Sequence, residues 1–124
     1  MPRNAIFECK ECSLPLTISV TEIGTDELRE VDGEPMIAEG HFCVSDGEFF
    51  IGTEGQPIVA PNSARNIQNN TIGGRLNGCC GLDGTDGMNQ VCINGHEVGT
   101  LRSDCWHPHC VHFDTDRTRR RAPE

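Results

Sequence analysis

Apolar and polar residues alternate along several short stretches of this chain. The clearest runs from Leu16 to Glu22, where Leu16, Ile18 and Val20 are each followed by a hydroxylic residue. Successive side chains of a β-strand point to opposite faces, so this period of two predicts a strand with one buried and one solvated face. We expect Leu16, Ile18 and Val20 to point toward the core.

Other short apolar stretches predict further strands, at residues 5–8, 41–45, 48–52 and 97–101. The strands at 41–45 and 48–52 are separated by Asp46-Gly47, a dipeptide typical of two-residue hairpin turns. Helical periodicity is weak, and the most that the pattern supports is single helical turns. It therefore predicts a mainly β, antiparallel fold with little helix.

The apolar core of such a fold is small. Leu, Ile, Val and Phe make up 27 of the 124 residues, and 14 glycines add no buried surface. This content is close to the roughly 20% below which chains tend to remain disordered. A chain of this length fits one domain, and a domain with so thin a core usually needs a covalent or metal staple. Eight cysteines are available for either kind.

The kind of staple depends on the compartment. Met1–Ala5 contain no apolar run of signal-peptide length, and no stretch is long and apolar enough to span a bilayer. The sequence therefore predicts a soluble, cytoplasmic protein, bacterial in style. Thiols stay reduced in the cytoplasm, so paired cysteines are expected to bind metal. An exported protein held by disulfides is the alternative.

The net charge of −9 is unevenly distributed. Residues 1–116 carry −12, whereas residues 117–124 carry +3. We expect residues 1–116 to form a zinc-stabilised β domain and residues 117–124 to be a disordered basic tail. The acidic body disfavours nucleic acid and anionic membranes as partners. The segment from Glu22 to Glu54 contains ten acidic residues and one basic residue, Arg29. We interpret it as a solvated face.

Cys9 and Cys12 have the C-x2-C spacing of a zinc knuckle, a tight turn that aims two thiolates at one point. A redox-active C-x-x-C is the alternative. That motif normally opens a helix, and Pro15 disfavours a helix here. The spacing therefore predicts two structural zinc ligands.

The remaining ligands are expected in the Gly/Asp-rich region around residues 78–95. Cys92 is followed by Gly95, which supplies the backbone freedom of a second knuckle turn. A further cysteine two or three positions on is missing, so we expect Cys80 as the fourth ligand, with Cys79 as the substitute. The predicted Zn²⁺ site is therefore Cys9, Cys12, Cys80 and Cys92. An all-cysteine site leaves no position for water and is structural.

A third group of metal-capable side chains lies near the C-terminus: Cys105, His107, His109, Cys110 and His112. These residues allow three interpretations. They are the end of a strand with local hydrogen bonds, or a second zinc site, or a catalytic site with a Cys-His pair or a zinc-bound water. In a strand His109 and Cys110 would face opposite ways, which disfavours a common centre.

Residues 78–109 carry the motifs GCCG, DG, CxxG and DCW. In this series the chain resembles small, uncharacterised bacterial zinc-binding proteins that are rich in cysteine. More distantly, its separated cysteine pairs are similar to the zinc-anchored β folds of the Yippee and cereblon-type domains. Cys80 and Cys92 stand where those families have a second C-x-x-C. The resemblance implies a small β fold stapled by structural zinc, of zinc-ribbon or β-tent type.

The function expected from these observations is that of a zinc-binding, non-catalytic domain for binding or regulation. It would act through a protein partner that recognises the acidic face. The alternative is a small metal- or thiol-dependent enzyme that uses the Cys105–His112 cluster. A nucleic-acid accessory role for the arginine tail is the third hypothesis.

Overall fold

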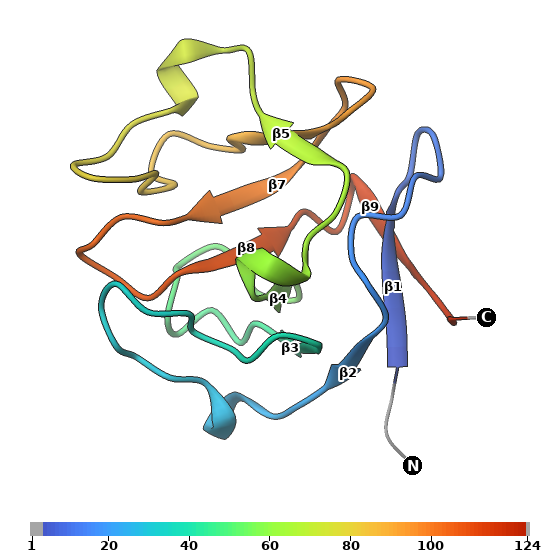
Figure 1. Ribbon diagram of the computed structural model, residues 1–124, viewed down its shortest axis with the longest axis horizontal. Helices are drawn as coiled ribbons and strands as arrows, with labels where there is room; N and C mark the ends of the chain where they lie inside the picture. The colour runs from blue at the N-terminus through green and yellow to red at the C-terminus, as the bar shows by residue number, and fades with distance from the viewer. Residues whose placement is uncertain (1–3, 124) are drawn as a thin grey trace.

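The structure is a computed structural model, and it describes residues 4–123. These residues form one sheet of nine strands, in the order β5-β6-β7-β8-β4-β3-β2-β1-β9 (Figure 1). The strands span Asn4–Cys9 (β1), Val20–Glu22 (β2), His41–Val44 (β3), Pro57–Val59 (β4), Ile67–Asn69 (β5), Gln90–Cys92 (β6), Glu97–Arg102 (β7), Cys110–Phe113 (β8) and Thr118–Arg121 (β9).

Neighbouring strands are antiparallel except β2 and β3, which are parallel. Three short 3-10 helices interrupt the loops, at Thr25–Glu27, Pro61–Ser63 and Gly73–Arg75, and the described residues contain no α-helix. The expectation of a mainly β fold is therefore confirmed. None of the helices between residues 4 and 123 has the length and apolar character needed to cross a membrane.

Alternation along the strands places a hydrophobic cluster on each face of the sheet. On β3, Phe42 packs in the larger cluster and its neighbour Cys43 in the smaller; on β4, Val59 and Ile58 divide in the same way. The smaller cluster is covered by loop residues, among them the buried Met36 and Ile37. The larger one contains Ala5, Phe7, Cys9, Leu16, Val20, Phe42, Val59, Cys92, Val98, Val111 and Phe113.

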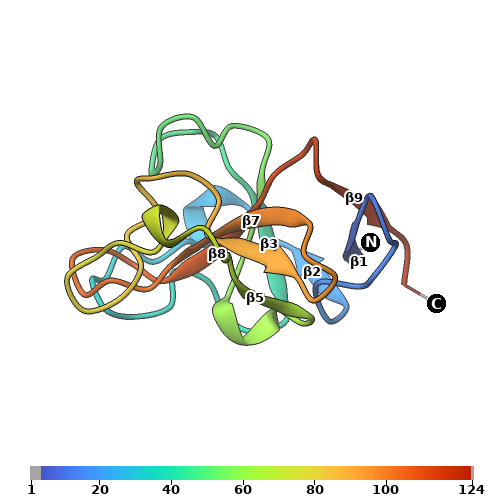
Figure 2. The ribbon, with the colours of Figure 1, turned by 90° about the horizontal axis from the view of Figure 1, so that it is seen from above.

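The larger cluster shows how strongly the sheet curls. It joins residues of β1, near one end of the strand order, to residues of β6 and β7, near the other end. Figure 1 shows β1 and β9 running across the direction of β7 and β8, and Figure 2 shows β1 almost end-on beside the rest of the sheet. The two ends of the sheet therefore approach each other across the larger cluster.

The expected hairpin at Asp46-Gly47 does not form. Residues 48–52 lie in a loop, and β3 pairs instead with β4. The loop is closed at its base because the amide of Ser45 donates to the carbonyl of Gln56, at 2.9 Å. The Ser45 hydroxyl also lies 2.7 Å from that of Thr53. Phe50 packs against the smaller cluster from this loop and is not part of a strand.

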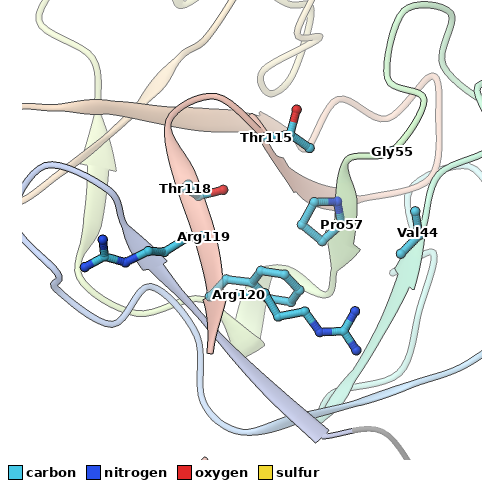
Figure 3. Close-up of a pocket in the computed structure, with 8 residues that line it drawn as sticks. Val44, Gly55, Pro57, Thr115, Thr118, Arg119 and Arg120 are labelled. Carbon is cyan, nitrogen blue, oxygen red and sulfur yellow. The ribbon is translucent and has the colours of Figure 1, made fainter. Parts of the chain in front are cut away.

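The described part of the expected disordered tail is ordered. Residues 118–121 form β9, which pairs with β1 from Cys9↔Thr118 to Ile6↔Arg121, and Glu124 lies outside the described residues. Figure 3 shows Arg119 and Arg120 pointing to opposite sides of β9, beside a groove of about 240 Å³. The side chain of Glu8, 7% exposed, binds both Arg119 (3.1 Å) and Arg121 (3.0 Å).

These ion pairs explain why the prediction of a disordered tail failed. The arginines gain their stabilising partners from β1, more than 100 residues away in sequence, and Arg120 also reaches Glu22 at 3.4 Å. A run of like charges is expected to be disordered when no opposite charges lie beside it. Here Glu8 and Glu22 supply those opposite charges.

Candidate metal centre

The first half of the centre is the turn after β1. Cys9 ends that strand, and its amide donates to the carbonyl of Leu14 at 2.9 Å. The amide of Ser13 donates back to the carbonyl of Cys9 at 2.8 Å. These two bonds close the turn around Cys12, so both thiols face the same point, as the C-x2-C spacing predicts.

The second half is the turn between β6 and β7. Cys92 ends β6, and its carbonyl accepts the amide of Gly95 at 2.8 Å, while its own amide donates to the carbonyl of His96 at 2.8 Å. Gly95 has a φ of 90°, which residues with a Cβ rarely adopt. The glycine therefore permits the tight reversal that returns His96 to the side of Cys92.

The two turns bring Cys9, Cys12, Cys92 and His96 together, with all four donor atoms within 4.8 Å of one another. The Sγ atoms of Cys12 and Cys92 are 3.8 Å apart, and Nδ1 of His96 lies 3.6 Å from Sγ of Cys9 and 3.3 Å from Sγ of Cys92. A tetrahedral zinc ion with ordinary bond lengths requires about 3.8 Å between two sulfurs and about 3.6 Å between sulfur and nitrogen. The donor set and its spacing therefore fit zinc.

The protein environment affects the thiols of this centre differently. Hydrogen bonds from the side chain of Asn94 and then from the backbone of Leu14 lower the pKa of Cys12 to about 6. Burial raises the pKa of Cys9. Metal binding requires thiolates and releases their protons, so the lowered pKa of Cys12 favours binding at neutral pH and the raised pKa of Cys9 opposes it.

Three of the four residues expected from the sequence lie in this cluster, and Cys80 does not. Cys80 is joined by a disulfide to Cys105, and Cys79 is an exposed free thiol outside the cluster. His96 occupies the corresponding corner because the hairpin places it directly beside Cys92. The signal was present as a C-x3-H spacing, which completes the C-x2-C of the first turn to a Cys3His set.

The side chains of the Cys105–His112 segment do not converge on one point. Cys110 is buried in the smaller cluster, and burial raises its pKa to about 12. His109 lies 3.1 Å through Nε2 from the carbonyl of Asp104, and His107 lies 3.0 Å through Nδ1 from that of Pro108. Among the described residues, Cys105 alone of this segment belongs to a metal-capable group, with Cys80 and Asp104.

His112 takes part in a hydrogen-bonded chain beside a polar cavity of about 480 Å³. Nε of Arg102 donates to Nε2 of His112 at 3.0 Å, so the His112 proton is on Nδ1, which donates to Oε1 of Gln56 at 2.7 Å. Burial, and then the charge of Arg102, lowers the pKa of His112 to about 3. The imidazole is therefore neutral and held in one tautomer.

Arg102 itself is fixed and has no carboxylate partner among the ion pairs of residues 4–123. Its guanidinium carbon lies 4.0 Å from the ring centroid of Phe50, and Nη1 donates to the carbonyl of Asp83 at 3.0 Å. Burial lowers the pKa of Arg102. The polar cavity thus has a positive charge in its wall, and the nearby carboxylate of Asp83, a backbone carbonyl and an aromatic ring offset part of that charge.

The chain matches no protein-family model, no curated protein and no solved structure. The resemblances noted from its motifs therefore extend no further than the residues that carry them. What the structure adds to them is a cysteine-rich, mainly β domain with a Cys3His cluster that can hold a metal ion such as zinc.

Proposed function

We propose that this protein is a zinc-binding, non-catalytic domain for binding or regulation. The observation that supports it is the closed donor set: Cys9, Cys12, Cys92 and His96 would occupy all four positions of a tetrahedral ion. Such an ion keeps no position for water or substrate, which is typical of structural zinc. Cys9 and Cys92 are also fully buried and Cys12 and His96 are half-buried, so the ion would be partly shielded from solvent.

The placement of the centre supports a stabilising role. Cys9 ends β1 and Cys92 ends β6, strands that lie near opposite ends of the sheet. An ion at this point holds together a curled sheet whose apolar core is thin. Structural zinc contributes about 10 kcal/mol or more of apparent binding free energy to folding at neutral pH.

Metal analysis tests this proposal. Protein purified without added zinc and without reductant should contain about one zinc ion per chain. His96→Ala, which leaves three thiolates, should hold the ion more weakly and release it more readily to a chelator, whereas Cys43→Ser, which removes a buried thiol outside the centre, should hold it as the wild type does. Cobalt substitution should give thiolate-to-cobalt charge-transfer bands in the wild type, and the cobalt spectrum of His96→Ala should be shifted because water would replace the imidazole. A folded wild-type protein without metal would contradict the proposal.

The partner we propose is a protein with a basic surface, recognised by the acidic segment between Glu22 and Glu54. Nine acids of this segment are exposed: Asp26, Glu27, Glu30, Asp32, Glu34, Glu39, Asp46, Glu48 and Glu54. Complementary charge increases association rates and suppresses wrong partners, and its effect weakens with salt. The segment packs on the smaller cluster through Met36 and Ile37, which gives its exposed acids a defined arrangement.

Charge-neutral variants test the partner. Immobilised wild-type protein should retain a basic partner that is released by salt, and the triple variant Asp26→Asn, Glu27→Gln, Glu30→Gln should not retain it. Glu11→Gln is the matched control, because Glu11 is an exposed acid outside the segment. Equal retention by all three proteins would exclude this segment as the recognition surface.

The alternative of a thiol- or metal-dependent enzyme at the Cys105–His112 segment gains less support. His112 is buried and held neutral, and Cys110 is a buried thiol with a raised pKa. A nucleophilic pair needs a reactive thiol next to a base that can accept its proton. Neither residue meets that need.

A second candidate function is the binding of a small anion in the polar cavity at Arg102. No carboxylate of residues 4–123 lies at ion-pair distance from the partly buried Arg102, so a bound anion would lower the cost of burying its charge, against the opposing charges of Asp86 and Asp114 in the cavity lining. The cavity, about 480 Å³, has the size of small-molecule sites, and Thr53 and Thr100 are among the residues that line it. The protein can be titrated with acetate and with inorganic phosphate while the amide chemical shifts of Gly84 and Thr100 are monitored. The shift changes should reach saturation with one of the two anions. Arg102→Met should abolish the shifts and Arg65→Met should not.

A further inference from the structure

The disulfide between Cys80 and Cys105 lies in a cluster that the Cys3His centre does not use. Cys80 belongs to the loop between the 3-10 helix at Gly73–Arg75 and β6, and Cys105 to the loop between β7 and β8. The carboxylate of Asp104 lies beside them, with Oδ1 3.3 Å from Sγ of Cys80. One donor atom from each of the three residues lies within 4.8 Å of the other two.

The two loops are held together by bonds other than the disulfide. The amide of Cys79 donates to Oδ2 of Asp104 at 2.9 Å. The amide of Ser103 donates to the carbonyl of Leu82 at 2.8 Å, and the Ser103 hydroxyl accepts the amide of Leu82 at 3.0 Å. Cleavage of the sulfur–sulfur bond therefore leaves the Cys80 and Cys105 sulfurs close to each other and to Asp104.

The cluster is also accessible from outside. Cys80 and Cys105 are both exposed, whereas Asp104 is only 3% exposed beneath them. A reductant can therefore reach the disulfide without unfolding of the domain. Two thiolates and a carboxylate are ligands that zinc accepts.

We propose that the Cys80–Cys105 disulfide and a second metal site are two redox states of this one cluster. A dithiol reductant attacks one sulfur of the disulfide as a thiolate and forms a mixed disulfide; its second thiol then resolves this intermediate. The reductant leaves as its own disulfide, and Cys80 and Cys105 gain two electrons and two protons. A zinc ion then displaces both thiol protons and binds the two thiolates together with Oδ1 of Asp104.

The second ion differs from the first in its coordination. Three protein donors leave one tetrahedral position for water, whereas the Cys3His set leaves none. The second ion is therefore the more easily chelated of the two. It is also present only under reducing conditions, so the occupancy of this site reports the thiol redox state.

The test compares oxidised protein with protein reduced by a phosphine, which does not add competing thiols. Zinc per chain after gel filtration should rise from about one to about two, and titratable thiols in denaturant from about six to about eight. Cys80→Ser and Cys105→Ser should each keep the first ion and gain no second one. Cys43→Ser, the matched control, should behave as the wild type.

Asp104→Asn tests the carboxylate separately. The amide keeps an oxygen for the Cys79 amide, so the loops remain tied, but the dissociation constant of the second ion should rise about tenfold or more. Reduced wild-type protein with eight free thiols and no second ion would overturn the proposal, as would a second ion in Cys80→Ser. Absence of the first ion alone would contradict the Cys3His centre. The gain of a second ion on reduction would still test the Cys80–Cys105 site.

Discussion

Sγ of Cys12 lies 3.8 Å from Sγ of Cys92, although 80 residues separate them in the sequence. The two thiols belong to turns at the ends of β1 and β6, strands near opposite ends of the sheet. A single ion between them would therefore close a curled sheet whose hydrophobic core is small.

The identity of the fourth donor should decide the stability of the domain. His96→Ala removes one donor and should lower the free energy of unfolding by at least about 5 kcal/mol, which is comparable to the total stability of a small domain. His96→Cys retains four donors and should restore a cooperative thermal transition. Thermal melts with and without a chelator measure both effects. A chelator-insensitive melt of the wild type would contradict the prediction.

The buried carboxylate of Glu8 should matter more than either arginine that it binds. Glu8→Ala leaves Arg119 and Arg121 without their shared partner and should cost about 2 kcal/mol, as for hydrogen bonds to charged groups. Arg119→Ala should cost about 0.5–1 kcal/mol because that side chain is half exposed. Urea unfolding measures these differences. The exposed Glu11→Ala serves as the control and should change little.

The stability of the domain should fall in acid partly because of His112. Its pKa is lowered in the folded state from about 6.5 to about 3, so the folded protein binds fewer protons than the unfolded chain in this interval. The stabilising contribution of neutral His112 is therefore complete above pH 6.5 and is lost as pH falls toward 3.

Urea unfolding of the wild type and of His112→Gln between pH 7 and pH 4 separates this effect from the other titrating groups, which both proteins share. The wild type should lose stability more steeply than the variant as the pH falls. Parallel curves would show that His112 does not carry the dependence.

Gly81 should be intolerant of a side chain. A Cβ at this position would overlap the carbonyl oxygen of Ser103, which is fixed in the backbone. Gly81→Ala should therefore separate the loops that carry Cys80 and Cys105 and cost about 1–3 kcal/mol. Gly73→Ala, with no atom within 4 Å of the added carbon, should remain within about 0.5 kcal/mol of the wild type. Urea unfolding and the rate of disulfide formation after reduction test both.

The hydrophobic pattern predicted the positions of several strands correctly but not how the strands pair. Residues 5–8 and 97–101 form strands as expected, and Leu16 and Val20 are fully buried. Residues 48–52 satisfied the same pattern but form a loop. Phe49 and Phe50 pack against the smaller cluster from this loop, and that tertiary contact is not visible in the pattern.

The sequence by itself determined the turns of the metal centre, because each depends on bonds within a few residues. Cys9 and Cys12 converge through the turn closed at Ser13 and Leu14, and Gly95 permits the reversal after Cys92. Only the tertiary structure decided which turns meet. It brings the ends of β1 and β6 together, joins Cys80 to Cys105 in a disulfide and pairs Arg119 with Glu8. These contacts join residues 25 to more than 100 positions apart, and no local pattern specifies them.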